Sequence, residues 1–313
     1  MLWLIGPGGL ALEYSKVLNA LNVKYSIIGR SKKSAQKFTS TTGLKVFSGG
    51  LSKFLDTNPT CPSKAIICVN VEELKATALD LINYGVKDIL LEKPGGINIK
   101  EVKELYKFVK RKKTNIKIAY NRRFYASVIK AKELIKRDGG VQNFNFNFTE
   151  RTHIIDKLGL SKPVLRNQFF LNSTHVIDLA FFLGGIPKKI TSYVSNNITW
   201  NKSPSIYCGA GETKQGAMFS YNANYKSTGR WSVELLTAKG KYTLCPLENL
   251  FFQKRGSFKI QQIKLNSKLD ENFKPGFYAQ LEAFLNNKLD DNLLSISRHC
   301  SMLNFYKKIS GKN

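Results

Sequence analysis

Short apolar runs alternate with longer amphipathic stretches along the first 120 residues. The apolar runs are bounded by glycine or polar residues and predict buried strands at residues 2–5, 25–28, 65–69, 89–91 and 116–119. Between them, apolar side chains that recur every three or four positions predict helices at 10–21, 71–84 and 102–111, and a polar helix follows residue 31. This alternation indicates a doubly wound parallel α/β sheet of the Rossmann type, which we expect to fill residues 1–120.

The remaining residues, 121–313, follow a different pattern. Short strands separated by turn residues run from 188 to 265, after a strictly alternating segment at 142–150. We therefore expect a second, α+β domain with a large, mostly antiparallel sheet. Its helices are predicted at 126–137, 174–183, 276–286 and 293–307, and the last of them can pack back on the first domain.

The alternating segment places Phe144, Phe146 and Phe148 on one face and Asn143, Asn145 and Asn147 on the other. Two interpretations of the phenylalanine face remain open. It packs against helices as the core of the second domain, which we favour, or it forms a buried interface between two copies of the chain.

The composition is that of a globular protein. The 313 residues are 42% hydrophobic and 23% charged, and this length exceeds what a single core usually fills, which supports two domains. The five cysteines are scattered without a C-x-x-C pair and indicate reduced thiols. No apolar run is long enough to span a membrane, and the first residues lack the features of a signal peptide, so we expect a cytoplasmic protein with no membrane partner.

The charge is unusual, because 49 Lys and Arg against 22 Asp and Glu give +27. The surplus is spread along the whole chain, with one short basic block at 110–113, and no zinc-finger, RNP or basic-zipper pattern occurs. We therefore expect no nucleic-acid partner. Attraction of an anionic small-molecule substrate is compatible with the charge.

A glycine motif, Gly6-x-Gly8-x-x-Ala11, lies between the first strand and the first helix. In this position glycines allow a tight turn and a close backbone approach to a pyrophosphate, and the helix start offers N–H donors. We predict a dinucleotide-binding loop with phosphate contacts at Gly6, Gly8, Gly9 and Leu10. The alternative is an ordinary glycine turn.

The end of the second strand predicts which dinucleotide binds. NAD specificity normally requires an acidic side chain there, and this chain has Arg30 and Ser31 followed by two lysines. We expect NADP to be preferred over NAD; the alternative is a solvated basic loop. Two further cofactor contacts, Val69 and Asn70, are predicted at the end of the strand at 65–69.

The segment Glu92-Lys93-Pro94 follows directly on the predicted strand at 89–91. Ligands of open α/β sheets bind at these carboxyl ends, so Glu92 and Lys93 are predicted to face the cofactor. A lysine there can exchange a proton with a substrate oxygen. The alternative is an ordinary lysine at a strand end.

A third candidate site is the segment from Asn172 to Asp178. Asn172 or Ser173 is a candidate helix N-cap, and His175 and Asp178 lie three residues apart on one helical face. Histidine is the common acid–base residue near neutral pH. The alternatives are a histidine hydrogen-bonded at a helix start or, with less support, a metal ligand; we expect no metal site.

These motifs occur in a fixed order: the glycine loop, Glu92-Lys93-Pro94, the segment 120–124 (YNRRF), then His175-x-x-Asp178-Leu179. Together they resemble the glucose–fructose oxidoreductase/inositol dehydrogenase/MocA family over essentially the whole chain. The resemblance implies a Rossmann domain, a second domain whose sheet often forms the dimer interface, and an active site between the two. It also implies hydride transfer between NAD(P) and a sugar, nucleotide sugar or cyclitol, by a homodimer or homotetramer.

The resemblance assigns individual roles as well. It makes Lys93 the catalytic lysine and His175 the active-site histidine, and it makes Asn121 and Arg123 substrate contacts. Many members have an aspartate four residues before the histidine, where this chain has Leu171. Asn172 can supply a polar substrate contact there but cannot act as an acid or a base.

Two other functions remain open from the sequence. One is a catalytically silent NAD(P)-binding regulator, because Leu171 replaces a family carboxylate. The other is a reductase of a non-carbohydrate carbonyl or imine, because fold-level similarity does not fix the substrate.

Overall fold

A computed structural model describes residues 1–198, 203–286 and 290–312. The chain divides into two compact units. The first unit is Met1–Asn121 with Leu269–Ser301, and the second is Arg122–Lys268 with Met302–Asn313. The chain therefore enters the second unit after Asn121, returns to the first near Leu269, and crosses once more within its last helix.

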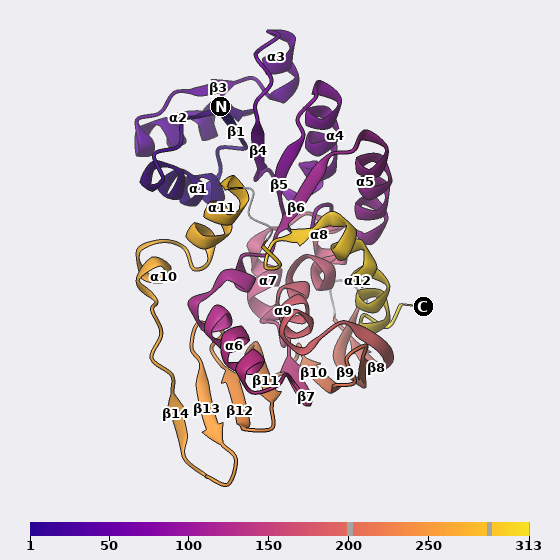
Figure 1. Ribbon diagram of the computed structural model, residues 1–313. Coiled ribbons are helices and arrows are strands. Elements are labelled where there is room, and N and C mark those ends of the chain that lie inside the picture. Colours follow the sequence, from indigo (N-terminus) through magenta and orange to yellow (C-terminus); the bar gives the residue numbers. More distant parts are fainter. Residues whose placement is uncertain (199–202, 287–289, 313) are drawn as a thin grey trace. The chain divides into compact units, whose positions relative to one another are not determined.

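The first unit is built on a mostly parallel sheet (Figure 1). In the described residues the strand order is β15-β6-β5-β4-β1-β2-β3, and every neighbouring pair is parallel except β15 with β6. This is the doubly wound sheet predicted from the sequence. The strands are β1 (Leu2–Ile5), β2 (Tyr25–Gly29), β3 (Val46–Ser48), β4 (Lys64–Ile67), β5 (Asp88–Glu92), β6 (Asn115–Ala119) and β15 (Leu294–Ser295).

Helices connect these strands. They are α1 (Gly9–Ala20), α2 (Lys32–Thr42), α3 (Leu51–Asp56), η1 (Val71–Glu73), α4 (Leu74–Tyr84) and α5 (Ile99–Lys112), with α11 (Phe277–Leu285) contributed by the later part of the chain. The sequence analysis did not predict β3 or α3, because both are very short. The helix predicted at 71–84 begins with the 3-10 turn η1 and continues as α4.

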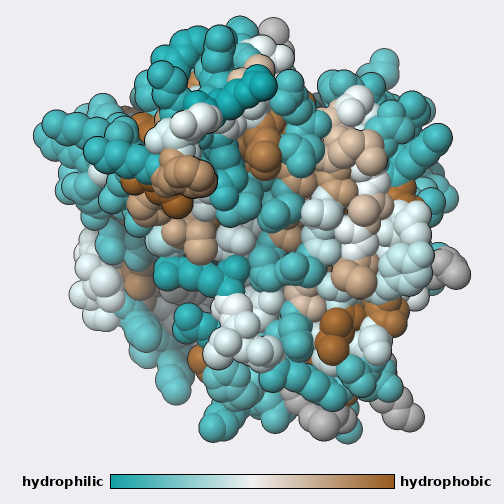
Figure 2. All heavy atoms as spheres, turned by 90° about the horizontal axis from the view of Figure 1, so that it is seen from below, coloured by the Kyte–Doolittle hydropathy of each residue, from teal (hydrophilic) through white to brown (hydrophobic). Residues whose placement is uncertain are grey.

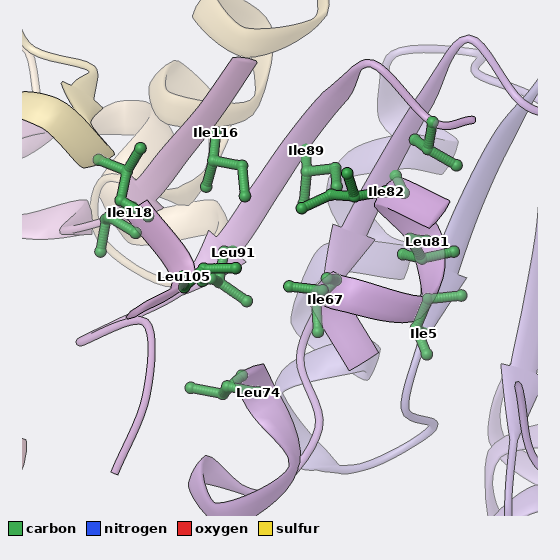
Figure 3. Close-up of a cluster of buried hydrophobic side chains, with 14 of the residues drawn as sticks. Ile5, Ile67, Leu74, Leu81, Ile82, Ile89, Leu91, Leu105, Ile116 and Ile118 are labelled. Carbon is green, nitrogen blue, oxygen red and sulfur yellow. The ribbon is translucent and has the colours of Figure 1, made fainter. Parts of the chain in front are cut away.

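The core of the first unit lies between the sheet and the helices α4 and α5. Figure 3 shows Ile67, Leu91 and Ile118 of neighbouring strands beside Leu81 of α4 and Leu105 of α5. All five side chains are buried. The central strands β1, β4 and β5 are mostly apolar because both faces of a parallel sheet are covered.

The second unit is built on a mostly antiparallel sheet. In the described residues its order is β14-β13-β12-β11-β7-β10-β9-β8, and only β7 with β10 is parallel. The α+β prediction for this part of the chain is confirmed. The strands are β7 (Asn143–Asn147), β8 (Pro187–Asn197), β9 (Pro204–Thr213), β10 (Met218–Asn224), β11 (Ser232–Leu236), β12 (Gly240–Leu244), β13 (Phe251–Lys254) and β14 (Ile260–Gln262).

The phenylalanine face of β7 is core. Phe144, Phe146 and Phe148 are buried, and the first two contact Phe181 of helix α9 (Thr174–Gly184) at ring-centroid distances of 5.9 and 5.6 Å. A helix of the same chain therefore covers this face. Of the two interpretations, core packing is confirmed and a subunit interface on this face is wrong.

The remaining helical segments are mostly short. They are η2 (Asn121–Phe124), α6 (Ala126–Arg137), α7 (Thr152–Ile155), η3 (Asp156–Leu158), α8 (Lys162–Arg166), η4 (Phe169–Ser173), α10 (Lys268–Asn272) and α12 (Ile296–Ile309). Ser173 occupies the predicted N-cap position directly before α9, but it does not cap the helix with its side chain. The π-helical turn η4 leads directly into α9, and the Ser173 side chain forms no capping hydrogen bond.

No helix in the described parts of the chain is long and apolar enough to cross a membrane. Figure 2 shows one face of the molecule, on which hydrophilic side chains predominate and hydrophobic ones form small separate patches. This surface agrees with the composition of a globular protein, of which 23% of the residues are charged.

Candidate functional site

The glycine loop follows β1 and leads into α1. Gly6 has a φ of +100°, and a Cβ atom there would lie 2.9 Å from Val69 Cγ1 and 3.0 Å from the Cys68 carbonyl carbon. Only glycine fits this position, since another side chain would meet both strain and steric overlap. A Cβ atom at Gly8 or Gly9 would meet nothing within 4 Å. The loop is therefore tight on its inner side and open above its second and third glycines.

A pocket of about 520 Å³ adjoins this loop, and we call it the loop pocket. Six of the predicted cofactor contacts line it: Gly6, Gly8, Arg30, Ser31, Val69 and Asn70. Gly9 and Leu10 are exposed on the first turn of α1, and neither they nor Glu92 and Lys93 belong to the lining. The structure thus brings together three separate stretches of the sequence, at the ends of β1, β2 and β4.

Arg30 has an acidic neighbour that the sequence analysis missed. Its guanidinium Nη1 lies 3.2 Å from Glu73 Oε1, and both side chains are largely exposed. Such an exposed pair stabilises the fold very little. Ser31 begins α2, where its hydroxyl accepts a hydrogen bond from the Ser34 backbone N–H at 3.5 Å. No sequence signal could have paired Arg30 with Glu73, because 43 residues separate them.

Glu92 is buried at the end of β5. The Tyr14 hydroxyl donates to its Oε1 at 2.7 Å, and the Lys93 backbone N–H donates to its Oε2 at 3.2 Å. Burial raises the pKa of Glu92, and the hydrogen bond from Tyr14 and the charge of Lys93 oppose that rise. Glu92 therefore anchors β5 to α1 beneath the glycine loop.

Lys93 is half-buried and follows Glu92 at the carboxyl end of β5. The next residue is held by a histidine that the sequence analysis did not place in a site: His299 Nε2 donates to the Pro94 carbonyl oxygen at 3.0 Å. His299 is fully buried in the first half of α12. A residue near the C-terminus, His299, therefore fixes the backbone carbonyl of Pro94 in the Glu92-Lys93-Pro94 segment.

Asn121 and Arg123 were predicted to contact the substrate. In the structure, the side chains of both form hydrogen bonds with other residues of the chain. Asn121 donates its amide to the Pro275 carbonyl oxygen at 2.9 Å. Arg123 forms two hydrogen bonds of 2.7 Å with Asp178, and both side chains are almost fully buried. This bidentate pair engages the carboxylate that a metal site with His175 would need.

A second pocket, of about 430 Å³, lies in the second unit, and we call it the arginine pocket. Its polar lining comes from η2, from the segment after β7 and from the segment before β11. Asn172, a predicted substrate contact, is part of this lining. The lining includes Arg122, Glu150, Arg151, Asn172, Arg230, Trp231 and Glu248.

His175 is buried in the first turn of α9, and its ring centroid lies 6.0 Å from that of Trp231 at the arginine pocket. Leu171 is buried one turn before it. Glu150 contacts the start of this segment, where its carboxylate accepts hydrogen bonds from the Asn172 amide at 2.7 Å and the Ser173 hydroxyl at 2.8 Å. Glu150 could not be assigned to the site from the sequence, because it lies in the segment after β7, 22 residues before Asn172.

The described residues contain no group of three or more His, Cys, Asp or Glu side chains placed to hold a metal ion. Lys93 belongs to the first unit and His175 to the second, so their joint action stays a prediction.

Sequence comparison gives no relatives: no protein-family model and no curated protein matches the chain. Comparison with solved structures gives many matches across nearly the whole chain. An oxidoreductase from Agrobacterium radiobacter, in complex with NAD⁺, L-tartaric acid and magnesium, matches with a TM-score of 0.79 and 13% identity. The match covers 98% of this chain and 94% of that one.

Two further matching structures are of dehydrogenases. UDP-N-acetylglucosamine 3-dehydrogenase from Acidithiobacillus ferrooxidans matches with a TM-score of 0.74 and 14% identity, over 99% of this chain and 96% of that one. The WlbA dehydrogenase from Bordetella pertussis, in complex with NADH and UDP-GlcNAcA, matches with a TM-score of 0.72 and 16% identity, over 98% and 94%.

The chain has the fold of NAD-binding oxidoreductases. The fold expected from the family resemblance is therefore confirmed over the whole length of the chain. At sequence identities of 13–16%, structural similarity establishes the fold only. The activity has to be inferred from the residues of the site.

Proposed function

We propose that this protein is an NAD(P)-dependent oxidoreductase that acts on a hydroxyl or keto group of a sugar-type substrate. The observation that carries the proposal is the loop pocket. Its loop accepts only glycine at residue 6, is open above Gly8 and Gly9, and lies between the first strand and first helix of a parallel sheet. Solved structures with this fold were described with NAD⁺ or NADH bound, which supports the same cofactor class here.

The residues of the loop pocket fit a dinucleotide. The open surface above Gly8 and Gly9 admits a pyrophosphate, and the first backbone N–H groups of α1 face it without a competing side-chain cap. Val69 and Asn70 form the wall at the end of β4. When bound, the nicotinamide supplies or accepts the hydride of the reaction.

We further propose that NADP is preferred over NAD. In the loop pocket, the end of β2 offers the Arg30 guanidinium and the Ser31 hydroxyl, and no carboxylate occupies positions 28–33 of the sequence. A 2′-phosphate would replace Glu73 as the partner of Arg30. This exchange is favourable, because a phosphate carries more charge than a carboxylate and accepts both arms of a guanidinium.

Lys93 and His175 are proposed to handle the substrate proton. One of them exchanges the proton of the reacting hydroxyl, and the other donates a hydrogen bond that orients and polarises the same oxygen. Both are suited to this by position: Lys93 ends a central strand of the first unit, and His175 adjoins the arginine pocket of the second. Of the four predicted substrate contacts (Asn121, Arg123, Asn172 and His175), Asn172 lines the arginine pocket.

The test is turnover by the Lys93→Ala variant, with Lys100→Ala, an exposed lysine at the start of α5, as the matched control. The first measurement is a screen of sugars, cyclitols and nucleotide sugars with NADP and NAD, followed at the nicotinamide absorbance. With the best substrate, we expect Lys93→Ala to keep NADPH affinity within a few-fold and to lose roughly two or more decades of kcat.

Near-normal turnover by Lys93→Ala would contradict a role of Lys93 in catalysis. NADPH binding without turnover of any carbonyl or alcohol in the screen would contradict an enzyme and favour the regulator. Turnover confined to non-carbohydrate carbonyls or imines would contradict a sugar-type substrate.

A further inference from the structure

Three arginines converge on the arginine pocket: Arg122 from η2, Arg151 after β7 and Arg230 before β11. Within the described residues, no carboxylate lies within ion-pair distance of any of them. Arginines near carboxylates elsewhere in the chain do pair, as Arg30 and Arg123 show. Three guanidinium groups that line one pocket give it a positive potential, which attracts an anion.

Arg122 is held in place by an aromatic ring. Its guanidinium carbon lies 4.8 Å from the centroid of the Trp231 ring. Stacking uses the flat face of the guanidinium and leaves the N–H groups at its edge available for a planar or tetrahedral anion. In the part of the chain that the structure describes, the buried Nε of Arg122 has no hydrogen-bond acceptor.

Within the described residues, neither carboxylate of the pocket lining forms an ion pair with these arginines. Glu150 is almost fully buried, and its two oxygens accept the hydrogen bonds of Asn172 and Ser173. The other carboxylate of the lining, Glu248, is exposed. Glu150 therefore fixes the Asn172 amide in the wall of the pocket. The arginines are the groups that can donate hydrogen bonds to a ligand in the pocket.

We propose that the arginine pocket binds an anionic group of the substrate, so that the enzyme acts on a sugar that carries a phosphate, a diphosphate or a carboxylate. This inference rests on the proposed oxidoreductase function and specifies its substrate class. Arg122 binds the anion from the stacked position over Trp231, and Arg151 and Arg230 close around it from the more exposed side. The pocket volume of about 430 Å³ is in the range of small-molecule sites.

The binding test uses the intrinsic fluorescence of the full-length protein, titrated with three probes: glucose 6-phosphate, uridine diphosphate and glucuronate. The variant is the double substitution Arg151→Gln/Arg230→Gln. The control is Arg166→Gln/Arg255→Gln, which removes two exposed arginines outside the pocket and so causes the same change in net charge. All four side chains are exposed, so we expect each variant to fold.

We expect at least one probe to bind, with an affinity about ten-fold or more weaker in the pocket variant and within two-fold of wild type in the control. The Trp231→Phe variant should lose the fluorescence change. The probe that binds most tightly identifies the anionic group. Equal losses in the two double variants, or no binding of any probe, would overturn the inference.

A kinetic arm separates this inference from the proposed function. If neutral sugars are turned over with the same kcat/KM as their phosphorylated or carboxylated counterparts, the anion site is wrong and the oxidoreductase stands. If the probes bind through Arg151 and Arg230 but nothing is turned over, the anion site stands and the oxidoreductase fails.

Discussion

At the scale of single residues, the proposed preference for NADP depends on Arg30 and its neighbour Glu73. The pair lies in the loop pocket, where the 2′ position of the adenosine ribose is expected. Glu73→Gln should raise NADPH affinity, because it removes a charge that competes with the 2′-phosphate. Arg30→Gln should lower NADPH affinity by about ten-fold and change NADH affinity much less. Titration of nicotinamide fluorescence measures both.

Lys37→Gln, which removes an exposed charge on α2 outside the loop pocket, is the control for this pair. If Arg30→Gln weakens NADH and NADPH equally, Arg30 does not read the 2′-phosphate. In that case the NADP preference is wrong.

Glu92 gives a prediction about pH and stability. Burial raises its pKa above the ordinary value of 4.5, so the folded state binds the proton more tightly than the unfolded state does. The carboxylate therefore lowers the free energy of unfolding increasingly as the pH rises from about 4.5 through the raised pKa, and the loss is complete above it. Each tenfold gain in proton affinity on folding corresponds to about 1.4 kcal/mol of the free energy of unfolding.

The Glu92→Gln variant removes this titration and keeps an oxygen that accepts from Tyr14. Its free energy of unfolding relative to wild type should rise with pH from about pH 4.5 upward, through the raised pKa of Glu92. Urea denaturation of the cofactor-free protein at several pH values measures the difference. A difference that stays constant, or falls with pH, would contradict the raised pKa.

At the scale of elements, β7 is the strand on which the second unit is assembled. It lies at the centre of the sheet between β11 and β10, and its three phenylalanines contact rings of α9, β9 and β10. The alternation of Phe and Asn predicted both the strand and its buried face. The parallel pairing with β10 could not be predicted, because it depends on contacts between residues about 75 positions apart.

Phe146→Ala should cost about 3–5 kcal/mol of the free energy of unfolding, since the ring is buried against Phe181 and Tyr221 and the vacated space is bounded by rigid neighbours. Asn145→Ala, on the exposed face of the same strand, is the control and should cost less than about 1 kcal/mol. Urea denaturation followed by circular dichroism measures both. Similar losses in the two variants would show that β7 is not organised by its phenylalanine face.

At the scale of the whole molecule, the open face of the second sheet stands out in a chain of charge +27. The cross-strand register places Tyr193, Cys208, Asn222 and Asn147 in one row, and Tyr193 and Cys208 are exposed. An exposed row of uncharged residues on a broad sheet suits contact with a second copy. We propose a homodimer or homotetramer formed through this face.

Light scattering of the purified protein should therefore give a multiple of the 35.3 kDa chain mass. Tyr193→Arg should shift the protein toward the monomer, because it places like charges opposite each other across a symmetric contact. Ile129→Arg, at an exposed position on α6, is the control. A monomeric wild-type protein would contradict the proposal.

The sequence by itself determined the two kinds of sheet, the order of most strands and helices, and the glycine loop with its neighbours Arg30, Val69 and Asn70. These features follow from local periodicity and from backbone requirements such as the positive φ at Gly6, which a single stretch of sequence expresses. Only the tertiary structure decided the partners: Glu73 beside Arg30, Glu150 beside Asn172, and Asp178 in a buried pair with Arg123. Such pairs form between segments that folding brings together from distant positions, and no local pattern records which charge will meet which.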